Sequence, residues 1–219
     1  MQYQWDFGFL LQYKSLIATG VLYTIGFTIG TAVSGLLLGC LIALARLSTL
    51  RFVGAIVIGF TEIFRCTPVL VQLVWCYYAL PMLTGIELSA ATAAFVTLTL
   101  YGGSFFGEII RGGIISVDIG QWDAGRALGM RRHQLMMRIV FPQAFRRMIP
   151  PLMNQTVLQL KNTSLLSVLA VPDLLYQGQL ITSASYRPLE TYTMIAVIYF
   201  ILLFPLTRFA HRLEARGSH

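Results

Sequence analysis

The chain has 219 residues, of which 56% are hydrophobic and 11% are charged, and its formal net charge is +7. The charged fraction is less than half of the roughly 25% typical of soluble domains, and the mean hydropathy is +0.70. This composition excludes an ordinary soluble domain and indicates a chain that is solvated mainly by lipid.

The first 14 residues are rich in aromatic side chains and contain Asp6 before the first basic residue, Lys14. A secretory signal peptide has the opposite arrangement, with a basic start, a short apolar core and a small-residue cleavage site. We therefore expect residues 1–14 to be retained as an external segment at the membrane interface.

Long stretches without any charged residue mark the membrane-spanning parts of the chain. They cover residues 15–45, 66–86, 88–107 and 191–207, and a fifth apolar block, 148–172, carries only Lys161. Because a helix needs about 20 apolar residues to cross the hydrocarbon core, the pattern predicts an all-α membrane protein with five transmembrane helices. The expected spans are about 15–45, 52–80, 88–111, 148–172 and 189–210.

Basic residues gather on one side of these spans. Two follow the first span, seven follow the third and three follow the fifth, which makes twelve of the sixteen basic residues. By the positive-inside rule, the N-terminus lies outside and the C-terminus in the cytoplasm. The same placement argues against nucleic acid as the partner of this basic chain. Residues 211–219 form a cytoplasmic tail, whose final Gly-Ser-His is compatible with a tag remnant.

The longest polar interval, 112–147, is a cytoplasmic loop with an internal pattern. Ala124, Ala127 and Leu128 recur at helical spacing and form a narrow apolar face of mostly small side chains. Gly129 is suited to a left-handed cap at the end of this helix, and a second helix is expected to end at Pro142. Small residues let a partner approach the backbone closely, so residues 121–142 are predicted to contact another protein.

This interval resembles the EAA loop of the membrane subunits of bacterial ABC importers. Asp123, Ala124 and Gly125 stand at the EAA positions, Gly129 at the glycine, and 139–142 at the I-x-L-P pattern, with Phe141 in place of leucine. In that family the loop is a coupling helix that docks into the ATPase subunit. The resemblance implies that the ATPase-coupling residues are Asp123, Ala124, Gly125, Ala127, Leu128, Gly129, Ile139 and Pro142.

Three other stretches resemble the polar amino acid branch of these importers. They are FRCTPVLVQ at 64–72, GEIIRGGIISVDIGQWDAG at 107–125, and LQLKNTSLLSVLAVPDLL at 158–175. The resemblance covers about residues 15–210 and implies a type I importer transmembrane domain in the bacterial inner membrane. The implied function is that of a permease subunit forming the path of a polar amino acid or similar small polar solute.

The chain has no GxxxxGK[ST] phosphate loop, so no catalytic role and no cofactor of its own are expected. The resemblance implies that ATP and Mg²⁺ are bound by a dimer of a partner ATPase subunit. It also implies a second permease subunit, identical or homologous, and an external solute-binding protein. No metal site is expected, because Cys40, Cys66 and Cys76 show no metal-ligand spacing and are interpreted as small core residues.

Lys161 lies within an apolar block and is followed by Asn162, Thr163 and Ser164. Ionisable residues in spans usually face the bundle interior or a water-filled path. Two interpretations remain open: a clamp between helices, or a lining of the solute path. The family has an acid at the position of Asn162, so the local field is more positive here. Further path candidates are Gln72 and Tyr77, whose aromatic neighbourhood is equally typical of an interfacial belt.

Two pairs at i, i+3 spacing, Glu62 with Arg65 and Glu108 with Arg111, are expected to be structural ion pairs. Glycines four residues apart, at 26/30, 35/39 and 103/107, predict close approach of helix backbones.

A secondary transporter or channel would use similar spans, but it would need acids inside the membrane for ion coupling. A membrane enzyme would need paired acids, metal ligands or a Ser-His arrangement. The sequence offers little support for either alternative.

Overall fold

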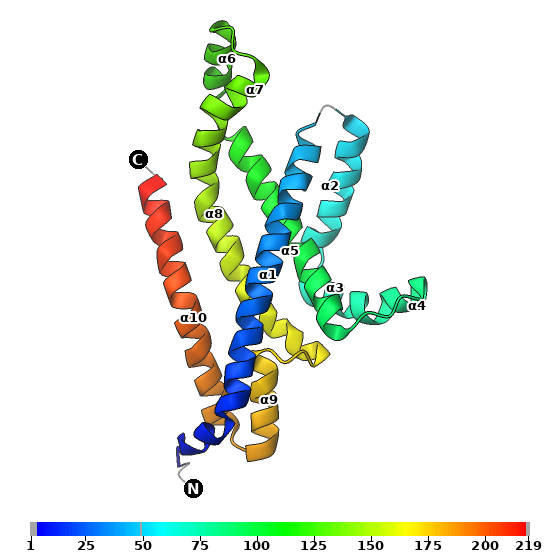
Figure 1. Ribbon diagram of the computed structural model, residues 1–219, viewed down its shortest axis with the longest axis vertical. Coiled ribbons are helices and arrows are strands. Elements are labelled where there is room, and N and C mark those ends of the chain that lie inside the picture. The colour runs from blue at the N-terminus through cyan, green and yellow to red at the C-terminus, as the bar shows by residue number, and fades with distance from the viewer. Residues whose placement is uncertain (1–3, 49, 218–219) are drawn as a thin grey trace.

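The computed structural model describes residues 4–48 and 50–217, so Ser218 and His219 of the possible tag remnant lie outside the described residues. The described chain is built from helices (Figure 1). In chain order they are η1 (Gly8–Tyr13), α1 (Lys14–Arg46), α2 (Arg51–Cys66), α3 (Val69–Val74), the π-helix η2 (Trp75–Ala79), α4 (Leu80–Thr84), α5 (Ala90–Ile115), α6 (Ile119–Ala127), α7 (Arg132–Leu135), the π-helix η3 (Met136–Val140), α8 (Phe141–Asn162), η4 (Thr163–Leu169), α9 (Leu174–Ser185) and α10 (Pro188–Gly217).

Three helical segments of the described chain are long and apolar enough to cross a membrane: Gly8–Arg46, Ala90–Ile115 and Pro188–Leu213. Two further segments pass the same test only as bent pairs, Phe52–Cys66 with Val69–Thr84 and Arg132–Leu169 with Leu174–Ser185. The fold class expected from the sequence, an all-α membrane protein, is confirmed, and the count of spans reaches five when each bent pair is one span.

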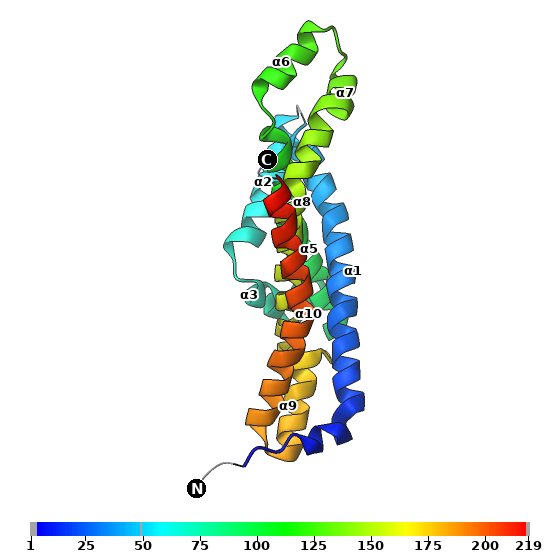
Figure 2. The same cartoon turned by 90° about the vertical axis from the view of Figure 1, so that its left-hand side faces the viewer.

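The two ends of the elongated molecule carry different elements and different chain termini. The turn between α6 and α7 and the C-terminus lie toward one end, while the N-terminus and α9 lie at the other (Figures 1 and 2). The N-terminal segment is attached there, because the backbone N–H of Asp6 donates to Glu190 at 3.2 Å and Arg187 pairs with Glu190 at 3.0 Å.

Helices α1 and α5 pack closely because glycines face each other along both. A Cβ added at Gly39 would lie 2.8 Å from the backbone nitrogen of Gly107, and one at Gly35 would lie 3.3 Å from that of Gly103. These separations are tighter than ordinary van der Waals contact, so a side chain at either position would push the helices apart. The predicted role of these two glycine steps is confirmed, whereas a Cβ at Gly26 would meet no atom within 4 Å.

The second expected span is interrupted by a bend of 106° between α2 and α3. Thr67 is extended before Pro68, which lacks the N–H needed to continue the helix. The amide of Gln72 compensates, because its Nε2 donates to the carbonyls of Phe64 at 2.8 Å and Thr67 at 3.0 Å. Carbonyls left free by the break therefore gain a donor from the same chain.

A second interruption separates η4 from α9, which meet at a bend of 45°. Ala170 adopts a left-handed conformation with φ of 55°. Asp173, which is fully buried, accepts hydrogen bonds from the N–H groups of Leu175 and Tyr176. The hydroxyl of Thr24 on α1 accepts the N–H of Leu174 at 3.2 Å. The start of α9 is thus capped by side chains within the apolar bundle.

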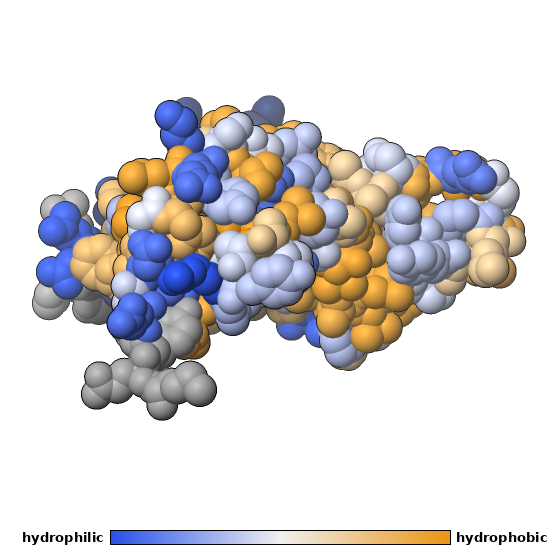
Figure 3. Space-filling model, turned by 90° about the horizontal axis from the view of Figure 1, so that it is seen from below, coloured by the Kyte–Doolittle hydropathy of each residue, from blue (hydrophilic) through white to orange (hydrophobic). Residues whose placement is uncertain are grey.

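Hydrophobic side chains form broad patches on the outside of the molecule, between scattered hydrophilic ones (Figure 3). Only 11% of the apolar window of α10 is buried within the chain, which leaves this helix available to lipid or to another subunit. The cysteines were interpreted as core residues, and this is wrong for two of them: Cys40 and Cys66 are exposed and only Cys76 is buried. Both lie on outward helix faces, where the thiol of Cys66 donates to the carboxylate of Glu62 at 3.3 Å.

Replacing Gly39 with alanine tests the packing of α1 on α5. Overpacking at a closely fitted position costs about 1–3 kcal/mol, so Gly39→Ala is expected to lower the thermal unfolding temperature of the purified protein in detergent. Gly26→Ala is the matched control on the same helix and is expected to be neutral, since a Cβ there meets open space. Equal melting temperatures for the two variants would contradict the proposed contact.

Candidate coupling site and translocation path

Helix α6 begins and ends with well-defined caps. At its start the carboxylate of Asp118 accepts the N–H of Gly120 at 2.6 Å. At its end Gly129 takes the predicted left-handed conformation, with φ of 71°. The N–H of Met130 donates to the carbonyl of Gly125 at 3.1 Å and that of Gly129 to Arg126 at 2.9 Å. This pair of bonds is a Schellman motif, which turns the chain sharply into α7.

The predicted contact face of α6 is open to its surroundings. Asp123, Ala124 and Ala127 are exposed, and the side chain of Leu128 is 79% exposed. Asp123 pairs with Arg126 at 3.2 Å, an exposed pair of the kind that contributes little to stability. The face therefore combines small side chains, one projecting leucine and a polar margin.

Gly125 points the other way, into the hairpin. It is buried, and a Cβ at this position would collide with the Cδ1 atom of Leu135. The glycine that replaces the second alanine of the EAA pattern therefore fits the close approach of α6 to α7. Its role here is packing within the hairpin.

The hairpin has its own apolar core, which joins α6 to the ends of α5 and α8. Its buried members are Val117, Leu135, Val140, Ala144 and Met148. Ile139, predicted as a coupling residue, packs against this core and is half-buried. It supports α6 from below instead of projecting from the surface.

The expectation that the second helix ends at Pro142 is wrong. Residues 136–140 form a π-helical turn, in which Phe141 donates its N–H to the carbonyl of Met136, and α8 continues directly from Phe141. Pro142 occupies the first turn of α8, where the missing N–H of proline does little harm. Its side chain is exposed, so Pro142 lies at the outer elbow between the hairpin and α8.

Polar side chains also fix the hairpin to its base. The amide of Gln143 on α8 donates to the carbonyl of Ile139 at 3.0 Å and, at 3.5 Å, to Gln121 on α6. The guanidinium of Arg147 donates to the carbonyl of Ser116 at the end of α5. The hairpin that carries α6 is therefore attached to both α5 and α8.

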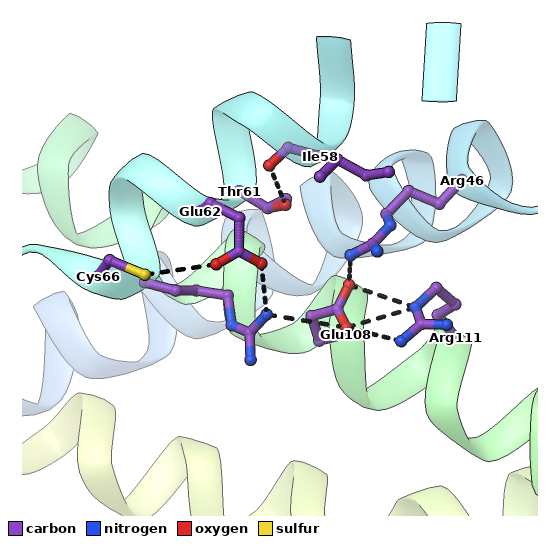
Figure 4. A network of polar contacts seen from close by, with 8 residues as sticks. Arg46, Ile58, Thr61, Glu62, Cys66, Glu108 and Arg111 are labelled. Carbon is purple, nitrogen blue, oxygen red and sulfur yellow. Dashed lines mark hydrogen bonds and ion pairs between the residues drawn. The ribbon is translucent and has the colours of Figure 1, made fainter. Parts of the chain in front are cut away.

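A network of charges ties together α1, α2 and α5 (Figure 4). Glu108 is its centre: it pairs with Arg46, with Arg111 at 3.0 Å and with Arg65 at 3.8 Å. Arg65 also pairs with Glu62 at 3.3 Å. The two predicted i, i+3 pairs are confirmed, and the structure adds that they belong to one network. The sequence did not predict that Arg46 belongs to this network, because only the tertiary fold brings the end of α1 to Glu108.

The candidate path residues at 161–164 are divided between surface and interior. Lys161 is exposed, and no described acid forms a salt bridge with it. Thr163 is fully buried and donates to the carbonyl of Leu160. Ser164 is partly buried and donates to the carbonyl of Lys161. Asn162 keeps a buried Nδ2 atom with no hydrogen-bond partner in the described part of the chain.

The other two path candidates, Gln72 and Tyr77, belong to α3 and η2, next to an apolar cluster of the bundle. This cluster contains Leu73 of α3 and Leu166 of η4, and Tyr77 packs against it. Gln72 uses its amide nitrogen on the break between α2 and α3, which is a structural role. No described hydrogen bond or ion pair joins Gln72 or Tyr77 to residues 161–164.

Two buried glutamines of α8 were not identified from the sequence. Gln159 is fully buried and donates to the carbonyl of Leu98 at 2.7 Å, in a space left by Gly102 on α5. Gln155 is 4% exposed. Amides at i, i+4 spacing in an apolar block were the available signal, since such groups join helices within a membrane.

Comparison with known proteins decides the family. The family model described as "Binding-protein-dependent transport system inner membrane component" matches residues 35–218. The chain belongs to this family. It is a permease subunit of the ABC importer class.

Similar relatives cover nearly the whole permease. The glutamine transport system permease protein GlnP of Escherichia coli (strain K12) is 35% identical over 97% of this chain and 98% of its own length. The arginine transport system permease protein ArtQ of Bacillus subtilis (strain 168) is 31% identical, with 96% of both chains covered. The L-cystine transport system permease protein TcyB of the same organism is 36% identical over 92% of this chain and 86% of its own.

Solved structures agree with the fold. The crystal structure of an amino acid ABC transporter with histidines superposes with a TM-score of 0.91 at 33% identity, covering 98% of this permease and 100% of that chain. An inward-facing form of the MetNI methionine ABC transporter gives a TM-score of 0.74 at 19% identity, over 95% and 99% of the two chains. The latter likeness concerns the fold alone.

Removing the central carboxylate tests the charge network. In the Glu108→Gln variant, Arg46, Arg65 and Arg111 lose their shared countercharge, and breaking a largely buried pair costs up to about 3 kcal/mol. We expect a marked fall in the melting temperature of the permease in detergent. Glu62→Gln is the control, because that side chain is 49% exposed and exposed pairs contribute about 1 kcal/mol or less. A larger loss for Glu62→Gln than for Glu108→Gln would contradict this order.

Proposed function

We propose that this permease forms the translocation path of an ATP-driven importer for a polar amino acid or similar small polar solute. The observation that carries the proposal is the exposed face of the α6 hairpin. Its residues Asp123, Ala124, Ala127 and Leu128 offer a docking face for a separate ATPase. The amino-acid transport named in the relatives supports the choice of solute class.

The coupling residues divide into two groups in this proposal. Asp123, Ala124, Ala127 and Leu128 make the contact with the ATPase subunit. Gly129 shapes the turn, and Gly125, Ile139 and Pro142 hold the hairpin on its base. Closure of an ATPase dimer on ATP and Mg²⁺ moves α6 as a rigid body, and α5 and α8 follow because they share the hairpin core.

The arrangement of the ends supports the proposed orientation. The α6–α7 turn and the C-terminus lie toward the same end of the molecule (Figure 1), and most basic residues belong to this end. By the positive-inside rule that end is cytoplasmic, so the N-terminus and the 172–190 interval with α9 are external. An external solute-binding protein docks on that outer end, and a second permease subunit, identical or homologous, completes the path in the inner membrane.

Lys161 is the main residue of the solute path in this proposal. Its exposed ammonium has no carboxylate partner in the described chain, and its neighbour Asn162 supplies an amide in place of an acid. A cationic, hydrogen-bonding site of this kind suits the α-carboxylate of an amino acid. Asn162 and Ser164 contribute polar groups beside it, while the buried Thr163 supports the local 3₁₀ conformation.

A bulky substitution on the docking face tests the coupling. Ala127→Trp places a large side chain on an exposed position, so we expect the permease to fold and insert normally. Close docking of the ATPase is then blocked, and solute-stimulated ATPase activity of the reconstituted complex should fall by tenfold or more, since a lost close contact of about 1.4 kcal/mol already gives tenfold. Ile119→Trp is the control. Ile119 lies on the same helix but outside the motif, and it is 73% exposed. Full coupling in Ala127→Trp would refute the docking role.

Removing the charge of Lys161 tests the path. A hydrogen bond to a charged group contributes about 1.5–3 kcal/mol, so Lys161→Met is expected to reduce solute uptake into proteoliposomes at least tenfold. ATPase activity without solute should not change, since Lys161 lies far along the chain from α6. Lys161→Arg keeps the charge and should retain much of the uptake. Wild-type uptake by Lys161→Met would remove Lys161 from the path.

A further inference from the structure

The elbow between α6 and α8 contains a cleft with a mixed polar and apolar lining that the coupling role leaves unexplained. Its volume is about 420 Å³, and it is lined by Gln121, Arg138, Ile139, Pro142, Gln143 and Arg146. Gln121 comes from the first turn of α6, and the other residues come from η3 and the start of α8. The cleft therefore lies at the base of the hairpin, on the side of the membrane-spanning bundle.

Two arginines without a countercharge line this cleft. Arg138 and Arg146 are both exposed, and neither forms a salt bridge in the part of the chain that the structure describes. No lining residue is acidic, and the nearby Asp123 is paired with Arg126. Guanidinium groups offer several fixed N–H donors, which match the oxygens of a phosphate group.

Two exposed aromatic residues of α8, Phe141 and Phe145, directly precede the cleft residues Pro142 and Arg146 in the chain. Phe141 and Phe145 are 42% and 48% exposed, and their ring centroids lie 5.8 Å apart. Exposed phenylalanines cost free energy in water, but they are well placed where acyl chains meet the headgroup layer. The start of α8 thus carries a cationic cleft beside an apolar strip.

The height of the cleft above the bilayer can be estimated from the helix rise of 1.5 Å per residue. The sequence predicts that the fourth span starts at residue 148, and a helix along the membrane normal then places Arg146 about 3 Å and Arg138 about 15 Å beyond the hydrocarbon edge. The headgroup layer of one leaflet is roughly 5–7 Å thick. On this estimate Arg146 lies within the headgroup layer, and Arg138 lies beyond it, where the long stem of an arginine is able to extend toward the headgroups.

We propose that this cleft binds the phosphate-bearing headgroup of an anionic phospholipid of the inner leaflet, held between Arg138 and Arg146 with an acyl chain along Phe141 and Phe145. The inference rests on the proposed orientation of the permease in the membrane. A bound lipid would brace the elbow where Pro142 and the π-helical turn replace regular α-helical hydrogen bonds. The docking face of α6 for the ATPase remains free, since its residues are not part of the cleft.

The test titrates the purified complex of permease and ATPase subunit, in neutral detergent, with phosphatidylglycerol or phosphatidylcholine and counts bound lipids by native mass spectrometry. The wild type should bind phosphatidylglycerol in preference to phosphatidylcholine. Each arginine near an anionic surface contributes about 1 kcal/mol, so R138Q/R146Q should weaken phosphatidylglycerol binding about ten- to thirtyfold. Phosphatidylcholine binding should not change.

The matched control is R208Q/R212Q, which removes two exposed arginines of α10 toward the same end of the molecule but outside the cleft. It should weaken phosphatidylglycerol binding clearly less than R138Q/R146Q does, because Arg208 and Arg212 line no shared cleft and offer only general, salt-screened attraction to an anionic lipid. Equal losses of phosphatidylglycerol binding in the two double variants would show that only general charge attraction is at work, and this would overturn the proposed site. If the double variant does not fold, the single variant Arg146→Gln replaces it in the test and should show part of the loss of phosphatidylglycerol binding.

Two further outcomes would also overturn the proposal. Release of the ATPase subunit from R138Q/R146Q would assign the arginines to protein docking. Displacement of phosphatidylglycerol by excess inorganic phosphate would assign the cleft to a soluble anion. Solute-stimulated ATPase activity of the wild type in phosphatidylcholine nanodiscs, measured in parallel, reports on the proposed transport function independently of lipid selectivity.

Discussion

An unpaired backbone N–H or C=O in hydrocarbon costs several kcal/mol, and this cost governs how the chain is allowed to interrupt its spans. Each of the two bent spans is repaired by side chains from nearby. Gln72 supplies donors to the carbonyls freed at the end of α2, and Asp173 with Thr24 supplies acceptors to the first N–H groups of α9. Residues that look like solute ligands in the sequence are therefore partly committed to the backbone.

The unbroken helices and the charge network define a rigid part of the molecule. Glycine contacts hold α1 against α5, and Glu108 on α5 binds arginines of α1 and α2. The hairpin core adds α6 and the start of α8 to the same body. Local breaks at Thr67–Pro68 and at Ala170 separate this body from α3, α4 and α9. Such breaks are where φ and ψ changes are absorbed most easily when helices move.

Local patterns predicted local structure well. The composition and the charge-free blocks predicted a helical membrane protein. The position of Gly129 predicted a left-handed turn after α6, and the i, i+3 spacing predicted the two ion pairs. Each of these features depends only on residues that are neighbours along the chain. Features that depend on the fold were not predictable in the same way. The approach of Arg46 to Glu108 joins residues 62 positions apart, and no periodicity encodes it. Pro142 was misjudged because a preceding π-helical turn lets a proline begin a new helix without breaking the path of the old one.

In the proposed function, the coupling hairpin and the solute path place opposite demands on the chain. Force transmission requires that α6 be fixed to α5 and α8, and the buried contact of Gly125 with Leu135 together with the Gln143 bridge meets this need. Transport requires that polar groups remain available, and Lys161 and the unpaired amide nitrogen of Asn162 lie in the last turn of α8, which η4 separates from the break at Ala170. One continuous rod, α8, thus carries a stiff attachment at its first turn and uncommitted polar groups at its last. A displacement of the hairpin that tilts α8 moves those groups most when the rod pivots near the hairpin core, because they lie at its far end.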